Sequence, residues 1–243
     1  MKKTIYFMVM ILLLGFWFLL TYEKTSIQPI DTQLTYQQLA QLDNQNIDTI
    51  KAQIDKIQKT LHINKTRSLA QRYAHSVVVG DSMVHALMDY QALPAYSLAG
   101  AIGRRTDNIY DQVDIALMRQ PTHIFLCLGI NDLSMYKKHF ERFEAEYQKV
   151  IEYIQQRNPA IQIYINSILP LPKETIKKHP EYQYINDYNK IIQKLCQKKQ
   201  IGYVDNSKLT KPELKNFESD GTHPKYPYYA AWIKNMADTA LLE

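Results

Sequence analysis

Residues 76–83 read SVVVGDSM, an apolar run that stops at a glycine and passes into a helical pattern from about Met83. Consecutive β-branched residues predict a buried strand. Four more apolar runs, each followed by a longer amphipathic stretch, repeat this pattern: 95–98 with 107–119, 123–129 with 138–157, 161–168 with 184–199, and 202–205 with 226–241. Because parallel strands need crossover connections, the pattern predicts a three-layer α/β/α sandwich around a five-stranded parallel sheet.

Ligand sites in such sheets form at the carboxyl ends of the strands, so the loops after the five runs are the places to examine. The first loop contains Gly80, Asp81 and Ser82. A serine there meets the free N–H groups and the positive dipole end of the following helix, which favour developing negative charge. Serine is also a common helix cap, so Ser82 by itself leaves both interpretations open.

The last loop, residues 220–224, reads DGTHP. Asp220 is close enough in sequence to His223 to hold one ring nitrogen and turn the other toward a nucleophile. An unactivated serine needs such a base. A capping turn ahead of the C-terminal helix is the alternative interpretation of the same residues.

Two loops between these can supply donors to an oxyanion. Residues 99–103 read AGAIG, and glycine lets backbone N–H groups approach a substrate closely. Residues 129–132 read GIND, and Asn131 carries a side-chain amide. A dinucleotide site is excluded at residues 99–103 because the G-x-G-x-x-G spacing is absent.

Taken in order, the four loops resemble the SGNH/GDSL hydrolase family, which has a Ser in a G-D-S block, a Gly, an Asn in a G-x-N-D block and a His in a D-x-x-H block. The resemblance covers about residue 75 to the C-terminus and implies the flavodoxin-like fold of that family. It implies that Ser82 is the nucleophile, that His223 is the general base and that Asp220 orients it. The backbone N–H of Ser82, Gly103 and Asn131 would form the oxyanion hole. No cofactor or metal is implied.

The sequence departs from the family pattern at two places. Met83 replaces the leucine of the G-D-S-L motif, at a position that performs no chemistry. The glycine block lacks the usual preceding asparagine, so Gly100 remains an alternative to Gly103 as the oxyanion donor. The following Arg104 and Arg105 resemble the Gly-Arg pattern of family members that modify bacterial cell-wall glycans, although a solvated helix start is the simpler interpretation.

The function implied is hydrolysis of a carboxylic ester through an acyl-enzyme on Ser82, with an acylated extracellular glycan or a lipid as the substrate. One alternative is an O-acyltransferase that acts on cell-surface polysaccharide with the same site, and another is a catalytically idle surface-binding domain. No G-x-S-x-G occurs, which argues against the α/β-hydrolase fold. A net charge of +5 with scattered lysines argues against nucleic acid as a partner.

The N-terminal segment predicts membrane attachment. Residues 4–22 are 19 residues without a charge, about the length that crosses a ~30 Å hydrocarbon core as a helix. We expect residues 1–24 to be an uncleaved signal anchor, because the run lacks the small-residue cleavage site of a secretory signal peptide. Lys2 and Lys3 would keep the N-terminus cytoplasmic and place the hydrolase domain outside the cell membrane.

Residues 25–74 are polar and glutamine-rich, and they are expected to form a helical stalk ahead of the hydrolase domain at 75–243. Isoleucine and leucine residues recur at spacings of three and four from Ile47 to Leu61, which places them on one stripe of a helix. Two heptads are too few for a coiled-coil prediction. The oligomeric state is therefore left open.

Two groups of residues are expected in the core. Cys127 and Cys196 lie within apolar runs, where small buried hydrophobic residues fit. The aromatic residues that follow the D-x-x-H block have helical spacing, which favours a core position, with a sugar-stacking wall as the alternative. These residues are Tyr226, Tyr228, Tyr229 and Trp232.

Overall fold

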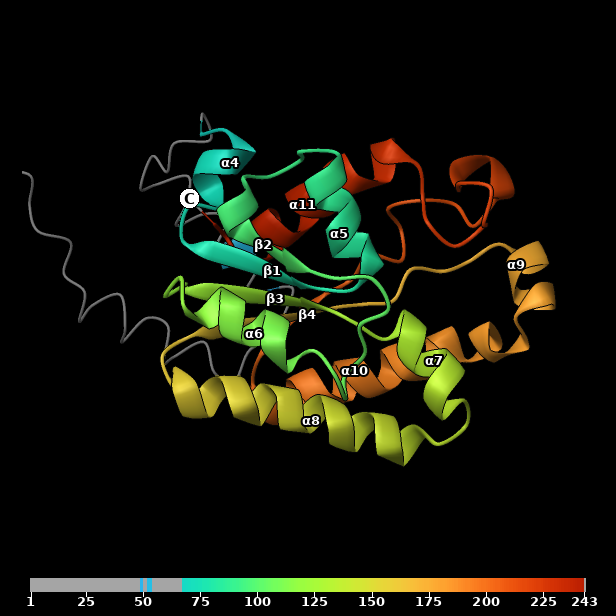
Figure 1. Ribbon diagram of the computed structural model, residues 1–243, viewed down its shortest axis with the longest axis horizontal. Coiled ribbons are helices and arrows are strands. Elements are labelled where there is room, and N and C mark those ends of the chain that lie inside the picture. The colour runs from blue at the N-terminus through green and yellow to red at the C-terminus, as the bar shows by residue number, and fades with distance from the viewer. Residues whose placement is uncertain (1–48, 50–51, 54–66, 243) are drawn as a thin grey trace, which may run out of the picture. The chain divides into compact units, whose positions relative to one another are not determined.

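The computed structural model describes Thr49, residues 52–53 and residues 67–242. Residues 67–242 contain a five-stranded sheet in the order β2-β1-β3-β4-β5, in which every neighbouring pair is parallel (Figure 1). The strands are β1 (Ser76–Gly80), β2 (Leu98–Gly100), β3 (His123–Cys127), β4 (Gln162–Asn166) and β5 (Gly202–Val204). The predicted five-stranded parallel sheet is therefore confirmed.

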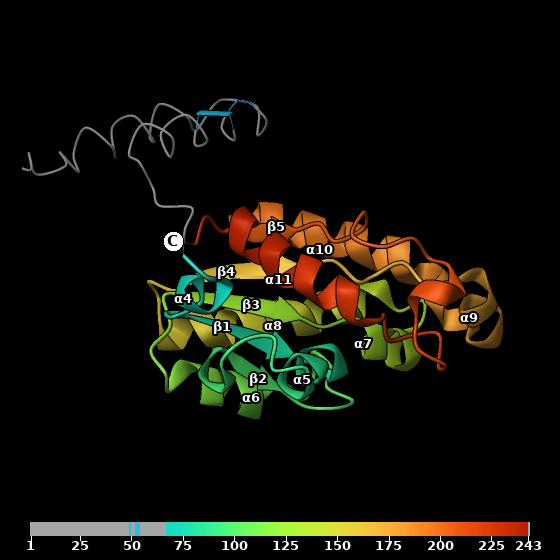
Figure 2. The same cartoon turned by 90° about the horizontal axis from the view of Figure 1, so that it is seen from above.

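Helices cover both faces of the sheet, with α6, α8 and α10 on one side and α5 and α11 on the other (Figures 1 and 2). The helices are α4 (Leu69–Arg72), α5 (Ser82–Asp89), α6 (Tyr110–Leu117), α7 (Ile130–Tyr136), α8 (Phe140–Arg157), α9 (Lys173–Lys178), α10 (Ile185–Lys199) and α11 (Tyr226–Thr239). The five predicted crossover and terminal helices are present. Helices α7 and α9 were not predicted, because a helix of about two turns shows too little periodicity to be recognised.

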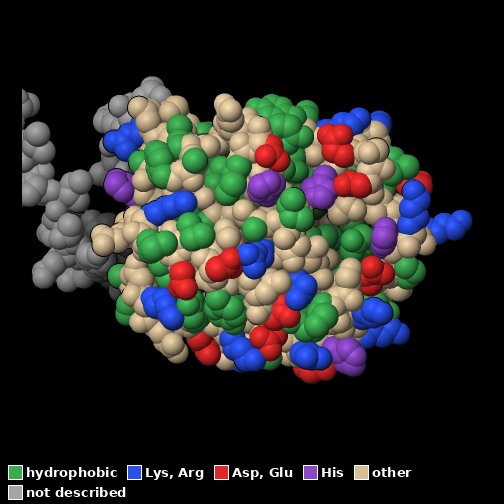
Figure 3. Space-filling view, in the orientation of Figure 1, with side chains coloured by type: hydrophobic (Ala, Val, Ile, Leu, Met, Phe, Trp, Pro, Cys, Tyr) green, Lys and Arg blue, Asp and Glu red, His purple; other side chains and the backbone are tan. Residues whose placement is uncertain are grey.

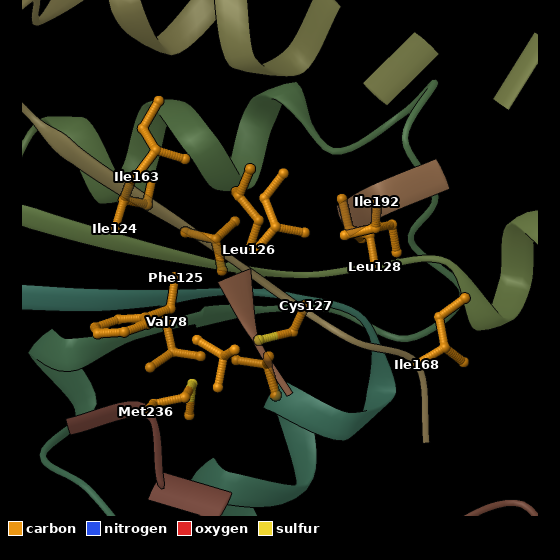
Figure 4. Packing of buried hydrophobic residues seen from close by; sticks show 14 of the residues in the cluster. Val78, Ile124, Phe125, Leu126, Cys127, Leu128, Ile163, Ile168, Ile192 and Met236 are labelled. Carbon is orange, nitrogen blue, oxygen red and sulfur yellow. The ribbon is translucent and has the colours of Figure 1, made fainter. Parts of the chain in front are cut away.

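The central strand β3 shows why its sequence is apolar without alternation. Ile124 and Leu126 point to the side of the sheet where Ile192 of α10 lies, whereas Phe125 points to the side of Met236 of α11 (Figure 4). All five side chains are buried. A parallel strand covered on both faces needs apolar residues at every position, which is the pattern that the sequence has.

The residues just before β1 pack on α11. Ser68 caps α4 in a capping box with Gln71. Tyr73 is fully buried, and its hydroxyl donates to the carbonyl of Ile233 at 2.7 Å. Arg72 donates to the carbonyl of Leu242 at 2.9 Å, so this segment also holds the C-terminal end of the domain.

The predicted signal anchor and most of the predicted stalk lie outside the described residues. Thr49, Ala52 and Gln53 are helical, and the isoleucine and leucine residues of the predicted apolar stripe lie outside the described residues. Within the described part of the chain, no helix has both the length and the hydropathy that crossing a membrane requires.

The sheet register places the functional loops together. Gly80, the last residue of β1, is paired with Gly100 of β2 on one side and with Cys127 of β3 on the other. The loops after these three strands therefore start side by side at one edge of the sheet. The β5 loop reaches the same edge because all five strands run in the same direction.

Candidate active site

Ser82 is the first residue of α5 and follows the end of β1 directly. The side chain of Asp81 caps this helix, because its Oδ1 accepts from the N–H of Met83 at 3.0 Å. Asp81 is buried, whereas Ser82 is half-buried. The cap leaves the N–H of Ser82, in the first helical turn, free for a ligand.

The loop before α11 holds Asp220 in a fixed orientation. Its Oδ1 accepts from the N–H of Thr222 at 2.8 Å and from the N–H of His223 at 3.0 Å. Gly221 has a φ of +69°, a left-handed conformation that glycine adopts without strain. The N–H of Glu218 donates to the carbonyl of His223 at 2.8 Å and closes the loop.

Asp220, His223 and Ser82 form a continuous chain of hydrogen bonds. His223 Nδ1 lies 2.6 Å from Asp220 Oδ2, and His223 Nε2 lies 2.8 Å from Ser82 Oγ. Burial alone would raise the pKa of Asp220, but the hydrogen bonds from His223 and Thr222 outweigh it and lower that pKa. An ionised carboxylate on Nδ1 holds the proton there and leaves Nε2 free to accept the serine proton.

Asn131 lies beside the nucleophile at the start of α7. Its Nδ2 donates to the carbonyl of Arg104 at 3.0 Å and lies 3.5 Å from Asp81 Oδ2. The neighbouring Asp132 is buried, and its Oδ1 accepts from both the N–H and the hydroxyl of Thr106, at 3.0 and 2.5 Å. This carboxylate therefore holds the loop that contains Gly103 against α7. The amide of Asn131 and the Gly103 loop consequently form one supported unit.

The two candidate glycines differ in their surroundings. Gly100 is the last residue of β2, and a Cβ there would come within 2.8 Å of the Val84 side chain. Gly103 has a φ of +74°, and a Cβ there would meet nothing within 4 Å. Packing alone explains the glycine at position 100. At Gly103 the left-handed backbone, and not packing, accounts for the glycine, and the open space around it leaves room for a ligand.

We expect Gly100→Ala to lower the free energy of unfolding by about 1–3 kcal/mol through overpacking against Val84. Gly103→Ala should cost about 1 kcal/mol through its left-handed backbone, yet it should lower kcat/KM for ester hydrolysis more than Gly100→Ala does. Urea unfolding curves and ester kinetics on both variants measure the two effects. The opposite ranking of the activities would make Gly100 the better candidate.

Arg104 and Arg105 are paired with residues of their own loop and of the first turn of α6. Arg104 donates to the carbonyl of Asn108 at 2.9 Å and pairs with Asp111 at 2.5 Å. Arg105 pairs with Asp107 at 3.0 Å. Both guanidinium groups thus stabilise the turn that leads from Gly103 to α6, which favours the structural interpretation of these arginines.

An apolar pocket opens beside Ser82 and His223. Leu128, Ile168 and Leu171 contribute to its walls, and Trp232 lies on the α11 side. The Trp232 indole is not a free donor, because its Nε1 donates to Asn166 Oδ1 at 2.9 Å. The space next to the nucleophile is therefore suited to the hydrocarbon part of an acyl group.

The loop between β4 and α10 supports the catalytic loop in a way that the sequence did not reveal. Thr175 of α9 is buried, and its hydroxyl donates to the carbonyl of Gly221 at 2.9 Å. The contact joins residues 46 positions apart. A lone threonine in a short helix gives no sequence signal for such a contact, since its role depends on tertiary packing.

Asp81 is a buried carboxyl next to the nucleophile, and burial raises its pKa to about 7. The N–H of Met83 opposes this shift, whereas the nearby Asp132 adds to it. The folded protein therefore keeps a proton on Asp81 at pH values where the unfolded chain has lost it. The stability that this proton contributes is complete below about pH 4 and is lost as the pH rises through about 7.

We therefore expect the free energy of unfolding of the parent to fall as the pH rises from 4 to 7. In Asp81→Asn the fall should be smaller by a few kcal/mol, because each unit of pKa difference between the folded and unfolded states corresponds to about 1.4 kcal/mol. Urea titrations at several pH values measure the two slopes. If the free energy of unfolding changed with pH equally in both proteins, the Asp81 carboxyl would already be ionised in the folded protein over this pH range.

The aromatic residues after His223 divide into two groups. Tyr228, Tyr229 and Trp232 are buried, as the core prediction requires, whereas Tyr226 is 50% exposed.

Cys127 and Cys196 are both free and buried. Among the residues that the structure describes, no group of three His, Cys, Asp or Glu side chains is arranged to hold a metal ion.

The parallel α/β sandwich and the Ser–His–Asp arrangement at its carboxyl edge define this chain as an ester hydrolase of the SGNH type. Residues 68–231 match the model of the GDSL-like lipase/acylhydrolase family, and the chain belongs to that family. A comparison with curated proteins finds no match to the sequence.

Solved structures with the same fold include three esterases or lipases. A GDSL-like lipase from Bacteroides thetaiotaomicron is 15% identical with a TM-score of 0.53, over 76% of this chain and 97% of that one. An acetyl xylan esterase is 20% identical with a TM-score of 0.51, over 67% and 98%. A family 3 carbohydrate esterase from Clostridium thermocellum is 16% identical with a TM-score of 0.50, over 68% and 94%. At these identities the likeness extends to the fold alone.

Proposed function

We propose that this protein hydrolyses a carboxylic ester in two steps through an acyl-enzyme on Ser82. The observation that carries the proposal is the hydrogen-bond chain from Ser82 Oγ to His223 Nε2 at 2.8 Å and from His223 Nδ1 to Asp220 Oδ2 at 2.6 Å. A serine hydroxyl is a weak nucleophile unless a base removes its proton, and this chain places a base on it.

In the first step, Ser82 Oγ attacks the ester carbonyl while His223 takes the serine proton. His223 then gives that proton to the departing alcohol, and the acyl group remains on Ser82. In the second step, His223 takes a proton from water, whose oxygen attacks the acyl-enzyme. The carboxylic acid leaves and the proton returns to Ser82.

The developing oxyanion would be held by the N–H of Ser82, the N–H of Gly103 and the side-chain amide of Asn131. Preorganised donors of this kind stabilise the transition state without reorganisation during the reaction. Asn131 is suited to the role because its Nδ2 donates one hydrogen to the Arg104 carbonyl at 3.0 Å, which orients the amide. The second hydrogen has only a long contact with Asp81 Oδ2, at 3.5 Å, and is the one that would turn to the oxyanion.

Asn131→Ala should lower kcat by about 10²–10³-fold, the usual cost of one oxyanion donor, with a smaller change in KM. Steady-state kinetics with p-nitrophenyl acetate measure the loss. Asn186→Ala, at an exposed position of α10, is the matched control and should retain parental kinetics. A tenfold or smaller loss in Asn131→Ala would remove this residue from the oxyanion hole.

We further propose that the substrate is an extracellular glycan and that the ester cleaved joins an acetyl or similarly short acyl group to one of its hydroxyls. Two proteins of the same fold are described as an acetyl xylan esterase and a carbohydrate esterase. On the face in Figure 3, acidic and basic side chains are intermixed, which suits an uncharged substrate better than a polyanion. The uncharged segment at residues 4–22 supports action on the outer side of a cell membrane.

Labelling with a fluorophosphonate probe tests the acyl-enzyme proposal on the full chain. Mass spectrometry of the labelled protein should find the adduct on Ser82. In a separate assay, the unlabelled protein should release carboxylic acid from p-nitrophenyl esters. Adding an oligosaccharide acceptor and analysing the products separates hydrolysis from acyl transfer. An unlabelled Ser82 in folded protein would instead favour an idle binding domain.

A further inference from the structure

Two tyrosine side chains form an exposed aromatic pair at the surface. Tyr90 follows the C-terminal end of α5, and Tyr226 is the first residue of α11. Their ring centroids lie 5.2 Å apart at an interplanar angle of 71°. They are 40% and 50% exposed, and among the described Tyr, Phe and Trp residues only Tyr96 is comparably exposed. We call Tyr90 and Tyr226 the tyrosine pair.

The tyrosine pair is continuous with the wall of the active site. The buried Tyr229 lies beneath it, with its ring centroid 5.2 Å from that of Tyr90. The hydroxyl of Tyr229 lies 3.7 Å from the sulfur of Met83, which lines the pocket next to Ser82. A single layer of side chains thus joins the pocket to the pair.

The distances fit a substrate that extends beyond the reacting ester. Ser82 begins α5 and Tyr90 follows its end, so the helix separates them by about 12 Å at 1.5 Å per residue. Tyr226 is three residues after His223, so their Cα atoms are at most about 11 Å apart. A ligand part that reaches the pair would lie about one or two sugar residues from the acyl group.

The chemistry of the pair favours a sugar ring over a protein partner or an acyl chain. A pyranose has a face of C–H groups that packs on an aromatic ring and a rim of hydroxyls. Two half-exposed tyrosines offer on the order of 200 Å² in total, far less than the ~800 Å² that each partner contributes to a stable protein interface.

Polar side chains are present on α5, the helix that ends just before Tyr90. His85 and Asp89 belong to α5, and both side chains are exposed, with His85 Nε2 and Asp89 Oδ1 3.9 Å apart. The phenol hydroxyls of the pair add further donors and acceptors. Sugar hydroxyls can exchange hydrogen bonds with groups of this kind, whereas a hydrocarbon chain cannot.

We propose that Tyr90 and Tyr226 form a sugar-binding subsite that stacks on a pyranose ring of an acylated glycan while the ester lies at Ser82. The inference rests on the proposed function, because it names the part of the substrate that lies outside the acyl pocket.

The test compares acetylated oligosaccharides of glucose, xylose and N-acetylglucosamine with p-nitrophenyl acetate, which has no sugar. The quantity compared is a ratio, namely kcat/KM for the best oligosaccharide divided by kcat/KM for the aryl ester. In the full chain, Tyr90→Ala/Tyr226→Ala should lower this ratio about tenfold, mainly through a higher KM for the oligosaccharide. Tyr90→Phe/Tyr226→Phe keeps the rings and should retain most of the ratio. Tyr96→Ala removes a tyrosine that is 52% exposed and lies in the turn before β2, outside the tyrosine pair, and should leave the ratio at the parental value.

Equal loss on both kinds of substrate would show that the pair serves the fold, and an unchanged ratio would show that no sugar binds there. Either result overturns the inference, as does a parent that hydrolyses the aryl ester but none of the oligosaccharides. A change in vesicle binding or in oligomeric state, with an unchanged ratio, would assign the pair to a membrane or to a second copy of the chain. If the parent hydrolyses neither kind of substrate, the proposed function itself fails.

Discussion

We expect Ser82→Ala to lower kcat/KM for p-nitrophenyl acetate by at least about 10⁴-fold, because it removes the hydroxyl that His223 can activate and that would carry the acyl group. Ser82 Oγ is the only hydroxyl recorded in hydrogen-bonding contact with the His223 ring among the described residues, at 2.8 Å. The alanine variant should also lose labelling by a fluorophosphonate probe. The oxyanion donors remain, so a rate above that of the uncatalysed reaction is expected to persist.

Ser207→Ala is the matched control, since Ser207 is exposed in the loop after β5. It should retain the parental rate and the parental unfolding curve. If Ser82→Ala hydrolysed the ester as fast as the parent, the assignment of the nucleophile would be wrong. A circular-dichroism spectrum identical to that of the parent separates loss of chemistry from loss of fold.

His223→Ala should cost about as much as Ser82→Ala, because residues that act as one unit lose their effect together. The double variant Ser82→Ala/His223→Ala should consequently be little slower than either single variant. In the proposed mechanism His223 accepts a proton in each step, first from Ser82 and then from water, and passes it to the alcohol and to Ser82, respectively. No second base contacts Ser82 Oγ in the described structure. Kinetics on the two single variants and the double variant measure this non-additivity.

Added imidazole should restore part of the activity of His223→Ala but none of that of Ser82→Ala, since it can replace a base but not the acyl carrier. His75→Ala is the control, because His75 is exposed just before the amino end of β1. If the loss of rate in the double variant equalled the product of the losses in the two single variants, His223 and Ser82 would act independently.

The residue types of the site could be predicted from the sequence because each occurs in a short local pattern. Ser82 stands where an apolar strand run ends, and Asp220 precedes His223 by three residues. The hydrogen bonds from Asp220 to the N–H groups of Thr222 and His223 are local as well. What the sequence could not show is that folding brings His223 to Ser82 across a sequence separation of 141.

The supporting residues were missed for the same reason. Thr175 holds Gly221, and Thr106 is bound by Asp132, through contacts between segments 46 and 26 residues apart. Neither threonine stands in a recognisable motif. Their roles depend on the packing of loops whose length and course no periodicity predicts.

The sequence by itself determined the layer architecture, because runs that are apolar at every position form strands covered on both faces, and the amphipathic stretches between them must supply the covers. Only the tertiary structure decided which glycine lies in the open turn, which of the aromatic residues after His223 reaches the surface, and which residues line the pocket. These features depend on the relative placement of loops at the carboxyl edge of the sheet. That placement is set by side-chain packing between distant segments, which hydrophobic periodicity does not encode.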